Sequence, residues 1–275
     1  MREEVLFTGI LEEEYEELWQ AKQLLEKPSF AIKAANYIGR PVEFAIEKLD
    51  SELVSRATNK ALTASLKVAI GSLEQEVLKP SSDTLHKVLV GGSGAVGGFF
   101  GLPALAVELP VSTTLMLRSI ADIAQSQGHD LNDPATGLAC LEVFALGSDK
   151  THSDDAAESA YYSARATLAV QMRMALKAVE KMSTKAIQDA LSRGQMPVLV
   201  KLIHTIAARF GITVSEKLVA QAVPVIGAAG GAGINLMFMQ HFQDMAQGHF
   251  VVKRLEKKYG EPFIQEIYDG IVLER

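Results

Sequence analysis

Apolar residues recur every three or four positions along nearly the whole chain, and no segment alternates apolar and polar residues over the length of a strand. The first pattern is typical of helices that bury one face, whereas the second would indicate half-buried strands. We therefore predict an all-α fold, a multi-helix bundle with no significant β-sheet. The expected helices cover roughly 12–26, 30–39, 41–49, 52–78, 83–100, 103–127, 134–147, 154–192, 196–210, 214–222, 225–259 and 261–271.

Capping residues support several of these boundaries. Asp133 precedes Pro134, which places an N-cap before proline at the first helical position. Thr213-Val-Ser-Glu216 has the pattern of a capping box, and Ser153-Asp-Asp155 offers acceptors to the start of a long helix. Gly194 and Pro197 mark a break after that helix.

Two stretches, Val88–Val107 and Leu218–Gln240, carry no charged residue and are rich in glycine. Spacing of four between small residues lets helices approach closely. The glycines that we expect at such contacts are Gly94, Gly97, Gly98, Gly101, Gly227, Gly230 and Gly231. The stretches are either tightly packed core helices or segments that contact or enter lipid. Their length suits a bilayer span, but glycine and alanine contribute little transfer energy.

Composition narrows the possible classes of protein. The chain has 275 residues, 48% of them hydrophobic, which is enough for a sizeable core. Its net charge of -6 argues against general affinity for nucleic acid, although Lys253, Arg254, Lys257 and Lys258 form a local basic patch. The lone Cys140 lies in an apolar setting, so we expect a buried, inert thiol rather than a disulfide or a nucleophile.

No low-complexity linker or fixed-period repeat divides the chain. We expect one α-helical domain over residues 1–275, with residues 1–50 peripheral to its core. The N-terminus opens with Met1-Arg-Glu-Glu4 and lacks the basic and apolar segments of a secretory signal. We therefore expect a cytoplasmic protein, either free or at the inner face of the cell membrane.

Three segments resemble the EcsC family. They are Gly94-Ala-Val-Gly-Gly-Phe-Phe-Gly-Leu-Pro-Ala-Leu-Ala-Val-Glu-Leu-Pro-Val111, Leu138-Ala-Cys-Leu-Glu-Val-Phe-Ala-Leu-Gly147 and Pro224-Val-Ile-Gly-Ala-Ala-Gly-Gly-Ala-Gly-Ile-Asn235 with the helix that follows. The resemblance covers roughly residues 15–270. It implies no settled activity, because the family has none. It implies a loose link to membranes, because the family is named after a gene beside that of an ABC transporter.

Polar residues inside the apolar helices are the candidates for a site. Glu108 and Asp122 share one helix face, and Arg118 lies four residues before Asp122. Glu142 is the only charge in 135–146, so it needs Arg118, Arg165, a metal ion or a proton as its partner unless it points to solvent. The row formed by Glu158, Tyr161, Tyr162 and Arg165 is either that partner surface or a solvated helix face.

Histidines on the last long predicted helix are candidate metal ligands. His241 and Asp244 share a face, whereas His249 lies eight residues after His241, about 12 Å along the axis. His241 and Asp244 could hold an ion together with Glu142 or Glu158 from another helix, or the histidines could be satisfied at a helix interface. The chain lacks Gly-x-Ser-x-Gly, His-Glu-x-x-His and nucleotide-binding loops, so neither a cofactor nor a reaction can be named.

Two hypotheses about function follow. The first is a non-enzymatic, membrane-associated helical protein, accessory to a transport or envelope process, with membrane lipid or a membrane protein as its partner and no nucleic acid. The second is a soluble enzyme or a protein that binds a small ligand or metal in an inter-helix cluster. That cluster would comprise Glu108, Arg118, Asp122, Glu142, Glu158, Arg165, His241, Asp244 and His249.

Overall fold

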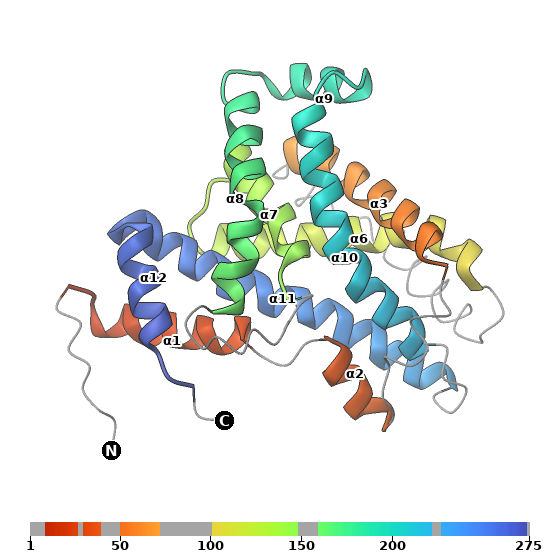
Figure 1. The fold of residues 1–275 in the computed structure, drawn as a ribbon, viewed down its shortest axis with the longest axis horizontal. Helices are drawn as coiled ribbons and strands as arrows, with labels where there is room; N and C mark the ends of the chain where they lie inside the picture. The colour runs from red at the N-terminus through yellow and green to blue at the C-terminus, as the bar shows by residue number, and fades with distance from the viewer. Residues whose placement is uncertain are drawn as a thin grey trace.

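The computed structural model describes residues 9–26, 30–39, 50–71, 101–147, 159–221 and 227–273, and within these ranges every regular element is a helix (Figure 1). The all-α prediction is therefore confirmed. The α-helices are α1 (Glu12–Leu25), α2 (Phe30–Ile38), α3 (Ser51–Gly71), α6 (Gly101–Ser126), α7 (Pro134–Glu142), α8 (Ala160–Val179), α9 (Thr184–Ser192), α10 (Pro197–Gln221), α11 (Gly227–Tyr259) and α12 (Glu261–Gly270). A short 3₁₀ helix, η2 (Val143–Ala145), extends α7.

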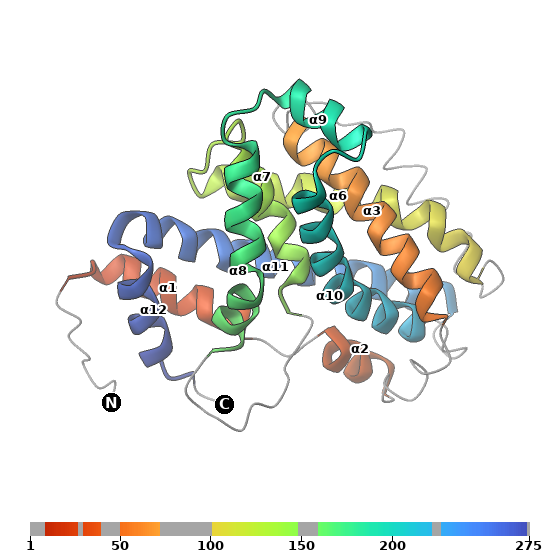
Figure 2. The same cartoon turned by 45° about the horizontal axis from the view of Figure 1, so that its top comes forward.

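The 33-residue helix α11 is the helix around which much of the bundle packs. It runs lengthwise through the lower half of Figure 1, with α1 and α12 beside one end and α2 beside the other. A second group, α3, α7, α8, α9 and α10, rises from it, as the tilted view of Figure 2 shows. Helix α6 joins the two groups because it packs against α3, α7 and α11.

Opposite charges hold α1 along α11. Arg254 donates to Glu17 at 2.6 Å, and Lys258 donates to Glu14 at 2.8 Å. Two residues of the basic patch seen in the sequence, Arg254 and Lys258, therefore face acidic residues of α1. Beneath these pairs, Leu18 is fully buried and Leu25 is 5% exposed.

Two helix boundaries differ from the prediction. The helix expected at 154–192 is two helices within the described residues, because Ser183 accepts from Ala186 N–H and starts α9. The break expected at the Thr213–Glu216 capping box is absent, since α10 runs unbroken to Gln221. Thr213 is fully buried and Glu216 is 7% exposed, so packing of this face overrides the local capping signal.

Other local expectations agree with the structure. Asp133 accepts from Ala135 N–H and Pro134 starts α7. The chain turns at Gly194 with a φ of 68°, and α10 begins at Pro197. Cys140 is fully buried, and burial raises the pKa of its thiol, so it is inert. The helices expected at 41–49 and 83–100 and the start expected at Ser153–Asp155 lie outside the described residues.

The contact between α1 and α11 depends on Gly248. A Cβ atom at this position would lie 2.6 Å from Leu25 Cγ and 2.9 Å from the backbone oxygen of Ala21. We expect Gly248→Ala to lower the free energy of unfolding by about 1–2 kcal/mol, measured by urea denaturation, because α1 must shift outward.

Gly211→Ala in α10 is the matched control. Its added Cβ would be 3.7 Å from the nearest atom, Oγ1 of Thr58, so the higher helix propensity of alanine should raise stability by up to about 1 kcal/mol. Equal effects of the two substitutions would contradict the close approach of α1 to α11.

Candidate functional site

Glu142 lies in the interior at the end of α7. Every residue of this helix from Thr136 onward is buried, and Glu142 itself is only 4% exposed. Its Oε2 atom lies 3.5 Å from Nε2 of His249, which is fully buried on α11. The buried carboxylate therefore faces an imidazole and not solvent.

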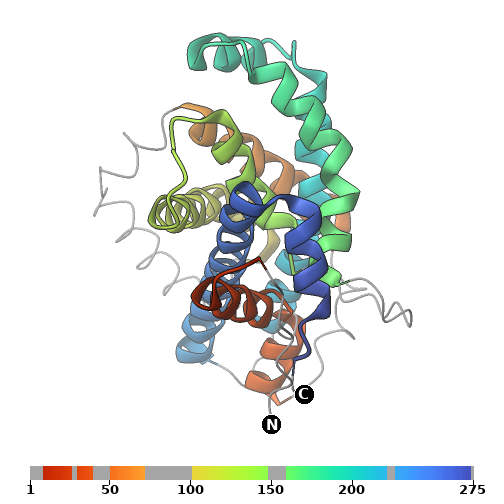
Figure 3. The same cartoon turned by 90° about the vertical axis from the view of Figure 1, so that its left-hand side faces the viewer.

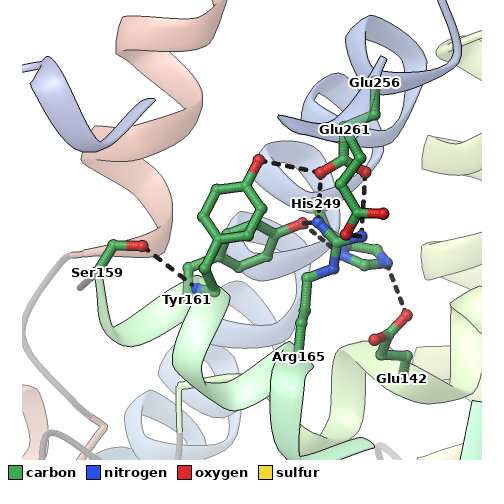
Figure 4. Close-up of polar contacts among 8 residues, drawn as sticks. Glu142, Ser159, Tyr161, Arg165, His249, Glu256 and Glu261 are labelled. Atoms are coloured by element: carbon green, nitrogen blue, oxygen red, sulfur yellow. Dashed lines mark hydrogen bonds and ion pairs between the residues drawn. The ribbon is translucent and has the colours of Figure 1, made fainter. Parts of the chain in front are cut away.

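Tyr161 on α8 completes the surroundings of His249 (Figure 4). Its hydroxyl lies 2.9 Å from Nδ1 of His249. Burial lowers the pKa of His249 well below its ordinary value and raises the pKa of Tyr161, so both groups are neutral. The Glu142 carboxyl group beside Nε2 favours the tautomer with its proton on Nε2, and in that tautomer Nδ1 accepts from the Tyr161 hydroxyl.

Arg165 extends these contacts about two turns further along α11, toward its C-terminal end. It donates to both carboxylate oxygens of Glu256, at 2.6 and 3.0 Å, and to the Tyr161 hydroxyl at 3.4 Å. Tyr162 donates a further hydrogen bond to Glu256 at 2.9 Å. Burial alone would lower the pKa of Arg165, but Tyr161 and the carboxylates of Glu256 and Glu142 raise it, so the guanidinium stays charged.

These five side chains, Glu142, Tyr161, Arg165, His249 and Glu256, form what we call the buried network. It ties α7, α8 and α11 together (Figure 4). A cavity bordering Tyr161 measures about 20 Å³, which is room for about one water molecule. The network can orient and neutralise buried charge, but this cavity offers no space for an organic substrate.

The contacts of His241 and Asp244 within the described residues do not include Glu142. His241 is 1% exposed, packs against Phe30 and Phe242, and has no hydrogen-bond partner among the described residues. Burial lowers its pKa to about 3. Asp244 lies 3.8 Å from Lys33 and accepts from Gln240 at 2.8 Å. No three His, Cys, Asp or Glu side chains within the described ranges come together to hold a metal ion.

The remaining candidates are distributed over other parts of the fold. Glu108 lies 3.7 Å from Lys217, which is 6% exposed and whose Nζ lies 4.8 Å from the ring centroid of Phe238. Asp122 is exposed on α6 and Arg118 is partly buried there. Glu158, Gly94, Gly97 and Gly98 lie outside the described residues, Gly101 starts α6, and Gly227, Gly230 and Gly231 lie in the first two turns of α11.

Sequence reasoning missed three buried or partly buried polar partners. Glu256 lies seven residues after His249, and this helical spacing could have flagged it. Lys217 pairs with Glu108, and Lys22 donates to the carbonyls of Tyr268 and Ile271 at 2.6 and 2.9 Å. No local sequence signal identifies Lys217 or Lys22 as a partner, because each of these two contacts joins distant parts of the chain.

Arg165 is expected to matter more for stability than Glu142. Arg165→Leu leaves Glu256 without its cation in the interior and should cost about 3–5 kcal/mol in the free energy of unfolding. Glu142→Gln removes a charge whose nearest partner is a neutral imidazole, so it should cost about 1 kcal/mol. Urea denaturation measures both.

Arg193→Gln removes an exposed pair with Asp189 and serves as the control, with an expected cost below about 0.5 kcal/mol. A loss for Glu142→Gln as large as that for Arg165→Leu would show that the charge of Glu142 is itself required.

His241 makes stability depend on pH. Its pKa is about 3 in the folded protein against an ordinary value of 6.5, so below pH 6.5 the unfolded chain binds a proton that the folded chain does not. Stability should therefore fall as the pH is lowered from 6.5, by about 2 kcal/mol at pH 5 from His241 alone. His241→Leu should flatten the pH profile of unfolding, whereas exposed His204→Gln should not. An unchanged profile in His241→Leu would contradict the buried, neutral imidazole.

Of three comparisons with known proteins, one finds a match. Neither the curated proteins nor the solved structures contain a match to this chain. The model of the EcsC protein family matches residues 12–255, a range that starts with α1 and ends near the end of α11. The chain therefore belongs to the EcsC protein family.

Proposed function

We propose that this protein is a non-enzymatic helical protein that associates with a membrane surface and acts as an accessory to a transport or envelope process. The observation that carries the proposal is an exposed surface of mixed apolar and cationic character on α8 and the turn into α9. We call this surface, formed by Val170, Arg173, Met174, Lys177, Lys181 and Lys185, the α8–α9 face.

Two aliphatic side chains in this surface are open to solvent. Val170 is 56% exposed and Met174 is 52% exposed, one helical turn apart on α8. A soluble helix normally turns such side chains toward the core, as α8 does with Leu168, Met172 and Ala175. Apolar side chains on the outer face can instead enter the interface between headgroups and acyl chains.

Cations surround the apolar pair. Arg173 and Lys177 share its helix face, and Lys181 and Lys185 follow in the turn and the start of α9, all four exposed. No ion pair joins any of the four to a carboxylate within the described residues. This local positive charge stands out on a chain with a net charge of -6. Each such cation contributes about 1 kcal/mol near an anionic lipid surface.

The position of this surface suits contact with a bilayer. In Figure 3, α9 lies at the top of the molecule and α8 descends from it along one outer edge. A bilayer is a broad surface, so it is met most easily by elements at the rim of a protein. A few cations with two inserting aliphatic side chains together provide several kcal/mol, which fits reversible attachment.

Helix α10 raises a separate possibility, a helix that spans the membrane. It is the one helix in the described part of the chain whose length and composition would let it cross a membrane, but it packs against α2, α3, α8 and α11 as a core helix does. Much of the first glycine-rich stretch lies outside the described residues. The proposal therefore rests on the α8–α9 face and not on a membrane-spanning segment.

The alternative function required the polar candidates to line one inter-helix cavity. Those within the described residues instead make separate contacts: Glu108 with Lys217, Asp244 with Lys33, and Glu142 and Arg165 within the buried network. No observation therefore favours the ligand-binding or enzymatic hypothesis over the membrane hypothesis.

Flotation with liposomes tests the proposal. The purified protein should float with vesicles that contain an anionic phospholipid, and high salt should release it because screening weakens the attraction. Val170→Ser with Met174→Ser, and separately Lys181→Gln with Lys185→Gln, should each lower the bound fraction several-fold. These side chains are exposed, so the variants should melt like the wild type.

Leu236→Ser is the matched control, because Leu236 is 70% exposed but lies on α11. Its flotation should equal that of the wild type. Wild-type protein that stays with the soluble fraction in every vesicle composition would end the membrane proposal. Loss of flotation in Leu236→Ser alone would move the contact to the second glycine-rich stretch.

A further inference from the structure

A groove separates the start of α7 from the second half of α8, next to the α8–α9 face. Its volume is about 430 Å³, within the range of small-molecule sites. The two helices stand side by side in Figure 2. The residues that line the groove are Asp133, Pro134, Ala135, Arg173, Leu176, Lys177, Val179 and Glu180.

Two cationic and two anionic side chains line the groove. Arg173 and Lys177 lie on α8, while Asp133 and Glu180 contribute a carboxylate from each wall. None of these four side chains forms an ion pair within the described residues. Asp133 uses Oδ1 to cap α7 by accepting from Ala135 N–H at 2.9 Å, which leaves its other oxygen for a ligand. A ligand that matches this lining carries one anionic and one cationic group.

The uncharged lining residues define the rest of the ligand. Pro134, Ala135, Leu176 and Val179 supply apolar surface, so the ligand also has an apolar part. None of the residues that line the groove is aromatic. Quaternary ammonium groups are recognised by aromatic cages, whereas a primary ammonium donates hydrogen bonds to carboxylates. The lining therefore favours a cationic group with N–H donors, such as a primary ammonium, over a quaternary ammonium.

We propose that the groove between α7 and α8 binds the headgroup of an ethanolamine phospholipid, with its phosphate on Arg173 and Lys177 and its ammonium on Asp133 and Glu180. Pro134, Ala135 and Leu176, which are partly exposed, contact the apolar part of the lipid beyond the phosphate. This inference rests on the proposed membrane function and adds a lipid class to it. An anionic glycerol headgroup would leave both carboxylates unmatched, and a choline headgroup would lack hydrogen bonds to them.

Titration with soluble short-chain lipids tests the groove without a bilayer. By calorimetry, dihexanoyl phosphatidylethanolamine should bind the wild type at least about tenfold more tightly than the choline and glycerol analogues. Asp133→Asn with Glu180→Gln should remove this preference and should tighten binding of the anionic glycerol analogue, because two negative charges beside its phosphate are lost. The fold should be retained, because asparagine also caps a helix. Arg173→Gln with Lys177→Gln should weaken all three lipids about tenfold or more.

Lys181→Gln with Lys185→Gln lies outside the groove and should bind the short-chain lipids like the wild type. Equal affinity for the three headgroups, or binding of inorganic phosphate as tight as that of the ethanolamine lipid, would overturn the proposal. Flotation separates this failure from failure of the membrane function. A protein that floats without headgroup preference refutes the groove alone, whereas one that binds the short-chain lipid but does not float refutes the membrane attachment alone.

Discussion

Helix α11 is enclosed over much of its length, and several of its polar side chains have partners on other helices. Together these partners fix the positions of four helices, α1, α2, α6 and α8. Asp244 meets Lys33 of α2, Gln243 donates to Ser119 of α6, and His249 and Glu256 meet α8. Arg254 and Lys258 meet α1. Hydrophobic contact alone would allow these helices to slide along α11, whereas a directional polar contact at each crossing specifies one register.

The period of the apolar residues was enough to predict the helical class, since nearly every helix buries one stripe and leaves the other to solvent. Boundaries failed where a local signal competed with packing. Thr213 and Glu216 match a capping box, yet both are buried inside α10, which continues to Gln221. Ser183 was overlooked because apolar periodicity continues on both sides of the break. A sequence records capping chemistry and periodicity, but it does not record which helix lies opposite.

The candidate site was likewise predictable from signals within one helix but not from contacts between helices. The isolation of Glu142 in an apolar helix indicated that it needs a buried partner, and the row through Tyr161 and Arg165 was one of the surfaces considered for it. The structure connects them, but through His249, which sequence reasoning grouped with His241 instead. That link could not be predicted, because helical spacing relates only residues of the same helix. Glu142, Tyr161 and His249 lie on three different helices. The glycines of the first uncharged stretch are not tested by the described residues.

Helix α8 connects the interior of the protein to its proposed membrane surface. Its first turns hold Tyr161, Tyr162 and Arg165 against α11 and α12, while its second half presents Val170 and Met174 to solvent. The bidentate pair of Arg165 with Glu256 resists rotation of α8, because turning the helix would break two charge-assisted hydrogen bonds between side chains that are largely shielded from solvent. The exposed aliphatic side chains therefore cannot be hidden by a small rotation of the helix. An outward apolar pair that the interior holds in place is therefore a fixed feature of the surface on which the membrane proposal rests.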